Sequence, residues 1–165
     1  MGLFKYDCFI PSLMSVPIHY LTIKVFATED ENAQELQERI EYFLPEEYED
    51  KKVKLEREEA VIEQGSDLYI YTASLKKSKH IRDALKLLKE LLGKKQCEKI
   101  ISQENRVDEK GALYIRIDKK RFAKERTAEL VDHGDCFHFK FMLAAHPKTR
   151  KRSLEIAQDL FRNEP

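Results

Sequence analysis

Apolar and polar residues alternate along several stretches of the chain, and this pattern predicts a β-sheet combined with amphipathic helices. Successive side chains of a strand point to opposite faces, whereas a helix repeats its apolar positions every three or four residues. Strands are expected near residues 18–27, 52–59, 67–74, 112–118 and 135–145. Helices are expected near 29–43, 78–93 and 149–162, with Gly93 capping the second and a short further helical piece at 97–103.

The first helix is preceded by a run of carboxylates in the stretch FATEDENAQELQERI, which extends from Phe26 to Ile40. Thr28 and Glu31 have the spacing of a capping box, in which each side chain bonds the backbone N–H of the other residue. Acidic residues also favour the positive end of the helix dipole. We therefore interpret these acids as a helix N-terminus rather than a metal or catalytic cluster, and Pro45 as the residue that stops the helix.

Four of the strands have one purely apolar face and one face that carries tyrosines or cations. The apolar sets are Leu21, Ile23 and Val25; Leu68 and Ile70; Leu113, Ile115 and Ile117; and Phe137, Phe139 and Phe141. The opposite sets are Tyr20, Thr22 and Lys24; Tyr69 and Tyr71; Tyr114 and Arg116; and His138 and Lys140. This division predicts an α+β two-layer sandwich, with a mostly antiparallel sheet and helices packed on one face.

The second helix shows a similar division between an apolar stripe and a basic row. Its apolar stripe comprises Ile81, Ala84, Leu85, Leu88 and Leu92. Its basic row comprises Lys79, Arg82, Lys86 and Lys89. The row would extend about 15 Å at 1.5 Å per residue, enough to follow a few phosphates. Taken alone, it is more simply explained as an ordinary solvated helix face.

Size and composition limit the classes of protein to which the chain can belong. The 165 residues suit one domain, expected at 17–165, and we expect residues 1–16 to be a dispensable extension. Three widely spaced cysteines without a CxxC pair indicate a reducing compartment, hence the cytoplasm. No apolar run approaches the roughly 18 residues of a membrane span. The 36% of charged residues suggests a thermophilic source.

The formal net charge of zero conceals a strong segregation of charge along the chain. Residues 29–59 carry 13 acidic side chains and 5 basic ones. Residues 76–99 carry 9 basic and 3 acidic side chains, and residues 116–126 carry 6 basic and 2 acidic ones. The protein is therefore polarised, and its net charge of zero is a cancellation of opposite blocks.

Cations near tyrosines are typical of RNA-binding surfaces, where bases stack on aromatic or Arg planes and Lys and Arg contact the backbone. We therefore predict a non-catalytic RNA-binding protein. The predicted contacts are Lys79, Arg82, Lys86, Lys89, Tyr69, Tyr71, Tyr114, Arg116, Lys119, Lys120 and Arg121. Tyr and Arg are also favoured at protein interfaces, so a homodimer or a protein-interaction module using the tyrosine face is an open alternative.

The segment DHGDCFH, from Asp132 to His138, is the one metal-like cluster in the sequence. Cys136 and His138 would point the same way on a strand, but structural zinc needs four ligands and no fourth is visible. A turn leading into a strand is the preferred interpretation. Asp118 has no catalytic partner and Cys136 has no orienting group, so we expect no enzyme, no metal and no cofactor.

Four segments together resemble a family of small archaeal proteins predicted to bind RNA and described as exosome-subunit-like. They are FATEDENAQELQERIEYFLP, IYTASLKKSKHIRDALKLLKELLG, LYIRIDKKRF and the closing strand and helix to Phe161. The third is the most specific, because it resembles the family's Y-L-R-[FLI]-D-K-Q pattern. The resemblance covers residues 18–161.

The resemblance implies an α+β fold akin to the ribosomal protein that binds the 5S RNA, also likened to double-stranded-RNA-binding domains. It implies no enzymatic activity and no cofactor. It also implies RNA-degradation machinery as a partner. It supports a functional patch of Tyr114, Arg116, Asp118, Lys119 and Lys120. The family's Gly-His-x-Gly-Asn-Pro-like loop corresponds here to IEQGSDLY, which keeps Gly65 but lacks the His and the Pro.

Overall fold

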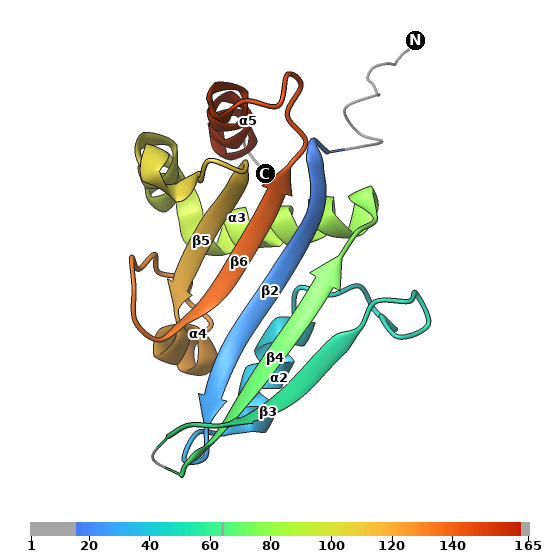
Figure 1. The fold of residues 1–165 in the computed structure, drawn as a ribbon, viewed down its shortest axis with the longest axis vertical. Coiled ribbons are helices and arrows are strands. Elements are labelled where there is room, and N and C mark those ends of the chain that lie inside the picture. Colours follow the sequence, from blue (N-terminus) through green and yellow to red (C-terminus); the bar gives the residue numbers. More distant parts are fainter. Residues whose placement is uncertain (1–15, 64, 163–165) are drawn as a thin grey trace.

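A five-stranded sheet forms one layer of the protein and helices form the other (Figure 1). The computed structural model describes residues 16–63 and 65–162, so the expectation for residues 1–16 lies almost wholly outside it. The elements in chain order are β2 (Ile18–Thr28), α2 (Ala33–Glu41), β3 (Leu55–Val61), β4 (Asp67–Leu75), α3 (Ser78–Ser102), η1 (Glu104–Arg106), β5 (Ala112–Asp118), α4 (Lys119–Glu125), β6 (Cys136–Leu143) and α5 (Arg150–Arg162).

The strand order is β3-β4-β2-β6-β5, and each neighbouring pair is antiparallel. Figure 1 looks onto the face of this sheet that no helix of the described residues covers, and α2, α3 and α4 lie behind it. We call the uncovered side the open face and the other the helix face. The predicted fold class, an α+β sandwich with a mostly antiparallel sheet, is confirmed.

The core lies between the helix face and the helices. The central strand β2 contributes Leu21, Ile23 and Val25, all completely buried. Phe43, which follows α2, packs edge-on against Phe139 of β6 with ring centroids 4.9 Å apart. Burying a side chain of this kind contributes roughly 1.5–3 kcal/mol, so these contacts fix the helix layer on one side of the sheet.

The start of α2 differs from the predicted capping box. Glu31 does accept hydrogen bonds from the Thr28 backbone N–H and hydroxyl, at 3.0 and 3.1 Å. The helix itself begins at Ala33, and Asn32 is its N-cap, accepting from the Glu35 N–H at 3.2 Å. The Thr28–Glu31 pair therefore forms a turn that precedes the helix.

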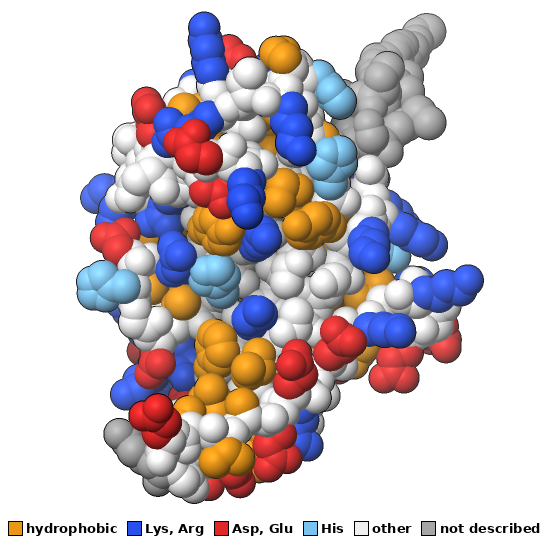
Figure 2. Space-filling view, viewed as in Figure 1, with side chains coloured by type: hydrophobic (Ala, Val, Ile, Leu, Met, Phe, Trp, Pro, Cys, Tyr) orange, Lys and Arg blue, Asp and Glu red, His pale blue; other side chains and the backbone are white. Residues whose placement is uncertain are grey.

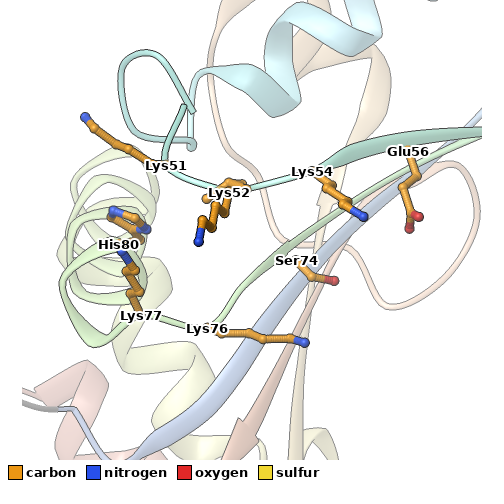
Figure 3. A pocket seen from close by; sticks show the side chains of 9 residues that line it. Lys51, Lys52, Lys54, Glu56, Ser74, Lys76, Lys77 and His80 are labelled. Carbon is orange, nitrogen blue, oxygen red and sulfur yellow. The ribbon is translucent and has the colours of Figure 1, made fainter. Parts of the chain in front are cut away.

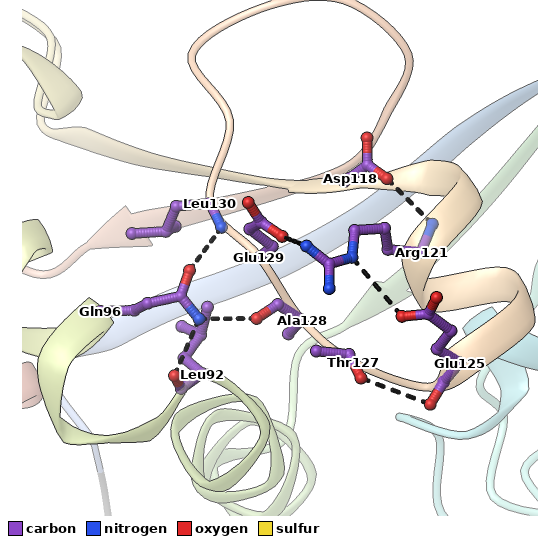
Figure 4. Close-up of polar contacts among 9 residues, drawn as sticks. All are labelled: Leu92, Gln96, Asp118, Arg121, Glu125, Thr127, Ala128, Glu129 and Leu130. Carbon is purple, nitrogen blue, oxygen red and sulfur yellow. Dashed lines mark hydrogen bonds and ion pairs between the residues drawn. The ribbon is translucent and has the colours of Figure 1, made fainter.

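The second predicted helix ends at Gly93, as expected. Gly93 has non-helical backbone angles, φ +79° and ψ 168°, and it marks a kink between two helices that together form α3. The second of these ends at Ser102 and includes most of the helical piece expected at 97–103. Beyond the kink, the Gln96 amide bonds the carbonyls of Leu92 and Ala128 and accepts from the Leu130 N–H (Figure 4). These bonds join the second half of α3 to the segment that leads into β6.

The helix α4 is absent from the predicted elements. Asp118 ends β5 and caps α4, because its carboxylate accepts a hydrogen bond from the Arg121 N–H at 2.9 Å. Phe122 is completely buried and anchors the helix in the core. The basic stretch after β5 is therefore the first turn of a helix, which decides where its cations point. Among the described residues, no helix combines the length and hydropathy needed to cross a membrane.

Candidate nucleic-acid interface

The faces of β4 are opposite to those predicted. Tyr71 pairs with Val25 and Tyr69 with Ala27, both core-facing residues of β2, so both tyrosines lie on the helix face. Tyr71 is only 4% exposed, and Tyr69 packs at the margin of the core with the Arg57 guanidinium 4.4 Å from its ring centroid. Their predicted position on the open face is wrong.

The reason for this error is visible in the second half of β4. Ala73 and Leu75 are fully buried and share a face with the tyrosines, while Thr72 and Ser74 alternate with them on the open face. The prediction rested on Leu68 and Ile70, which instead pair with Thr28 and Phe26 on the open face. Because a strand has a period of two, this choice moved every side chain of β4 to the wrong face.

Three basic side chains form a row across the open face. Arg116 of β5 pairs with His138 of β6, and His138 pairs with Lys24 of β2. Adjacent strands lie about 4.8 Å apart, so the row spans roughly 10 Å. Next to it, Lys140 of β6 pairs with Tyr114 of β5 on one side and Thr22 of β2 on the other. We call Arg116, His138, Lys24 and Lys140 the basic cluster.

Two tyrosines lie among these cations. The Tyr114 ring is 5.5 Å from the His138 ring, and the Arg116 guanidinium carbon is 5.7 Å from the centroid of the Tyr114 ring. The Lys140 ammonium is 5.9 Å from the centroid of the Tyr20 ring. Both tyrosines are half-buried, so part of each ring is accessible from the open face.

The electrostatic environment of this cluster is strongly positive. Burial lowers the pKa of His138, and the charges of Arg116, Lys24 and Lys140 lower it further. Burial raises the pKa of Tyr114, and the hydrogen bond that its hydroxyl donates to Asp108, at 3.1 Å, acts in the same direction. An anion bound here would relieve the repulsion among the cations.

A hollow of about 350 Å³ adjoins the basic cluster at the end of β2. Phe26 lines it and is 44% exposed, which is unusual for a phenylalanine on the central strand of a sheet. Arg116 and His138 form another part of its wall, and the turn at 132–135 closes it. The hollow thus combines an aromatic face with cations, which suits a stacked base beside a phosphate.

Lys119, a predicted RNA contact, is buried. It is 2% exposed, and its ammonium group donates to the Phe26 carbonyl at 2.9 Å and to Glu31 at 2.8 Å. Asp135 lies 3.8 Å away. As the first residue of α4, Lys119 links this helix to the end of β2 and to Glu31, so its ammonium group is already engaged by the protein. It also lines the hollow beside Phe26, and its contact with RNA stays a prediction.

The two basic residues that follow differ from each other. Lys120 is exposed on α4, next to the acidic N-terminus of α2. Arg121 is half-exposed and forms ion pairs with Glu125 and Glu129 (Figure 4). Neither belongs to the basic cluster, and the charge of Arg121 is already compensated. Asp118, which the resemblance placed in the same patch, is occupied in capping α4.

The basic row predicted on α3 lies in the helix layer, behind the sheet in Figure 1. Lys79 and Lys86 are exposed, Arg82 is half-buried, and Lys89 is only 7% exposed. Lys89 follows Leu85 by four residues, and this spacing brings it to the edge of the apolar stripe. The row is therefore interrupted, and it does not share a surface with the basic cluster.

Charge is distributed unevenly over the open face. Figure 2 shows Lys and Arg side chains across its middle and upper part, and Asp and Glu along its lower right edge, where β3 runs. On β3, Glu56 and Glu58 pair with Thr72 and Ile70 and so lie on the open face. The face thus has a basic side at β5, β6 and β2 and an acidic edge at β3.

Several residues of this surface were not predicted as contacts. The alternation of β2 and β6 correctly placed Tyr20, Lys24, His138 and Lys140 on the open face, but on the sequence they are scattered and no local motif joins them. Phe26 could have been found from the same alternation, because it follows Thr22 and Lys24 on the polar side of β2. Only strand pairing brings these residues together.

The cluster from Asp132 to His138 does not converge on a point. Cys136 and His138 do share the open face, as predicted, but Asp132 pairs with Arg106 at 3.4 Å. Burial raises the pKa of the Cys136 thiol, which opposes formation of a thiolate. Within residues 16–63 and 65–162, no group of three or more His, Cys, Asp or Glu side chains could hold a metal ion.

Solved structures with the same fold come from archaea. Protein AF2318 from Archaeglobus fulgidus, described as family-model DUF54, is 29% identical with a TM-score of 0.73, covering 87% of this chain and 99% of that one. Mth689, a DUF54 protein from Methanothermobacter thermautotrophicus, is 24% identical with a TM-score of 0.70, covering 87% and 98%. The latter likeness shows the fold alone.

Sequence comparison adds a functional description. RNA-binding protein PAB1135 from Pyrococcus abyssi (strain GE5 / Orsay) is 27% identical over 147 residues, which is 88% of this chain and 95% of that protein. A family model described as RNA binding matches residues 20–143, which include all five strands except the first two residues of β2. The protein therefore belongs to this RNA-binding family.

Proposed function

We propose that this protein binds RNA without catalysis and that the open face of its sheet is the binding surface. The observation that carries the proposal is the row of Arg116, His138 and Lys24 across three adjacent strands. Membership of the RNA-binding family supports RNA as the ligand.

The chemistry of the face suits a single-stranded or looped RNA. Arg116, Lys24 and Lys140 supply charge for the backbone, and the rings of Tyr114, Tyr20 and Phe26 offer stacking surfaces. Stacking of a base on an aromatic ring contributes about 1–3 kcal/mol and tolerates any base. The exposed Phe26 ring supports this over a face that binds phosphates alone, because an apolar ring can stack on a base but forms no hydrogen bond or ion pair with a phosphate.

The test compares two pairs of neutral substitutions. Arg116→Gln with Lys140→Gln removes two charges from the open face, and Lys79→Gln with Lys86→Gln removes two from the exposed side of α3. We expect the first pair to weaken binding of several unrelated single-stranded RNAs. The slope of log K against log salt concentration should become less steep by about 1.4, because each of the two lost phosphate contacts accounts for roughly 0.7. Fluorescence anisotropy at several salt concentrations measures both quantities.

The matched pair on α3 changes the net charge by the same amount and should leave affinity and salt dependence nearly unchanged. Equal effects of the two pairs would refute the assignment of the open face. If the open-face pair instead changed the molecular mass in solution and left RNA affinity intact, the face would be a homodimer interface. A partner in RNA degradation stays a prediction from the sequence resemblance.

A further inference from the structure

A second basic surface lies where the loop after α2, the beginning of β3 and the beginning of α3 meet. Here a pocket of about 400 Å³ is lined by five lysines, and we call it the lysine pocket (Figure 3). Its lysines are Lys51, Lys52, Lys54, Lys76 and Lys77. Ser74 and His80 also line it, and Glu56 is its one carboxylate.

The five ammonium groups are not compensated by the protein. Within the described part of the chain, none of these lysines forms an ion pair. Five positive charges around one hollow with a single carboxylate repel one another, and this repulsion is relieved when an anion enters. A surface that only needed solubility would not gather its cations around a concave site.

His80 is a second, independent feature of the lysine pocket. The residue is 8% exposed, and its Nδ1 atom is buried without a hydrogen-bond partner in the described part of the chain. Figure 3 shows its ring beside Lys77, facing the hollow toward Lys52. Burial lowers the pKa of His80, and the charges of Lys77 and Lys51 lower it further. An unpaired buried nitrogen destabilises the fold unless something else compensates for it.

The 25-residue helix α3 begins at the same place. Lys77 is its N-cap and provides no side-chain hydrogen bond to the first turn. The first backbone N–H groups of a helix have no partner within the helix, and together with the helix dipole they favour phosphate. The pocket thus combines lysine charge, a hydroxyl, an unpaired imidazole nitrogen and a helix N-terminus.

We propose that the lysine pocket binds a doubly charged phosphate group and that, in an RNA ligand, this group is the terminal phosphate of the chain. The identification of the RNA end rests on the function proposed above. Its structural basis is the position of Ser74, which lies on the open face in the row that continues through Thr22 to Lys140 and Tyr114. Two strand spacings, roughly 10 Å, separate Ser74 from Lys140.

The first experiment compares one single-stranded RNA with a 5′-hydroxyl, a 5′-phosphate or a 3′-phosphate by calorimetry. We expect one phosphorylated end to bind about tenfold more tightly than the hydroxyl form, because the lysine ammonium groups form charge-assisted hydrogen bonds with a phosphate. Lys51→Gln with Lys77→Gln should abolish this preference. Lys94→Gln with Lys95→Gln, two exposed lysines beyond the kink of α3, should preserve it.

The second experiment titrates pyrophosphate and follows the backbone amides of Ser74 and residues 78–80 by NMR. One outcome is that the shifts saturate in the wild type and vanish in the Lys51/Lys77 variant while the RNA experiment shows no preference for phosphorylated ends. That result would support a phosphate site whose ligand is a free phosphorylated compound. If the wild type shows no preference for a phosphorylated end and no shifts with pyrophosphate, the proposal is overturned. Affinity for the hydroxyl-ended RNA reports on the open face separately, so failure of the two proposals can be told apart.

Discussion

Arg116 and His138 are direct cross-strand partners on the open face of the sheet, although they lie 22 positions apart in sequence. Their side chains share a face with Lys24, which pairs with His138 from the other side. Cations held this close on a half-buried surface repel one another, and the lowered pKa of His138 is one consequence. The cluster is therefore poised to bind an anion.

The Tyr114 ring should contribute to RNA binding through stacking rather than through its hydroxyl. Tyr114→Ala is expected to weaken binding by about 1–3 kcal/mol, the usual range for loss of a stacked base. Tyr114→Phe keeps the ring and removes only the hydrogen bond to Asp108, so it should bind like the wild type. Fluorescence anisotropy with one RNA measures both variants; a loss in Tyr114→Phe equal to that in Tyr114→Ala would contradict stacking.

RNA affinity should increase as the pH falls through the titration of His138. Its pKa in the free protein lies below 6.5, so the ring is neutral near pH 7. A bound phosphate favours the charged ring and raises this pKa, so binding takes up a proton and strengthens by up to about tenfold per unit of pKa difference. Affinity measured between pH 8 and pH 5.5 checks this.

The control for this pH dependence is a second histidine. His138→Gln should flatten the profile, whereas His146→Gln, an exposed residue outside the sheet, should leave it unchanged. An identical profile in the wild type and in His138→Gln would show that other groups carry the dependence.

The Lys119–Glu31 ion pair should stabilise the fold. Burial alone would raise the pKa of Glu31, but the hydrogen bonds from Lys119 and Thr28 and the charge of Lys119 lower it overall. A lowered folded-state pKa means that this stabilisation is complete above the unfolded value of 4.5 and is lost as the pH falls through the folded value. Lys119→Ala should reduce the free energy of unfolding at pH 7 by about 1–3 kcal/mol, measured by urea denaturation.

As the pH falls through the folded-state pKa of Glu31, the wild type and Lys119→Ala should become closer in stability, because Glu31 is then protonated in both. Lys120→Ala is the matched control: its side chain is exposed on the same turn of α4 and should change stability by less than about 0.5 kcal/mol. A constant difference between wild type and Lys119→Ala at every pH would show that Glu31 is not the partner that matters.

Tyr71 should affect folding and not RNA binding. Because its ring is buried against the helix layer, Tyr71→Ala should destabilise the protein by about 3–5 kcal/mol, as other large aromatic truncations do. Tyr71→Phe keeps the ring and should retain both stability and RNA affinity. Thermal unfolding and anisotropy measure the two properties; loss of RNA affinity in a fully folded Tyr71→Phe would contradict the observed face of β4.

Sequence patterns predicted the layers well and the surface less well. The strands β2, β5 and β6 alternate between buried and more exposed residues over most of their length, and their buried faces were correctly predicted. In its first half, β4 carries apolar or aromatic residues on both of its faces, so the alternation there is ambiguous. Only Thr72 and Ser74, in the second half, show which face is polar. Where the local pattern has two solutions, pairing with β2 decides between them.

The candidate site shows a second limit. Nothing in the composition of the KKRF stretch distinguishes Lys119 from Lys120, yet one is buried and the other exposed. The difference arises from Asp118, which starts α4 and directs Lys119 under the sheet toward Glu31, 88 positions earlier. Burial of a charged residue depends on such distant partners, which no local window contains.

The carboxylates of Glu56 and Glu58 on β3 have a consequence for the encounter with a ligand. They place a repulsive border on the same face that carries Arg116, Lys24 and Lys140. Electrostatic steering should therefore orient an approaching polyanion before any contact forms, with its charge directed toward the basic cluster and away from Glu58. The uneven charge of the face would in this way favour one orientation of the bound chain.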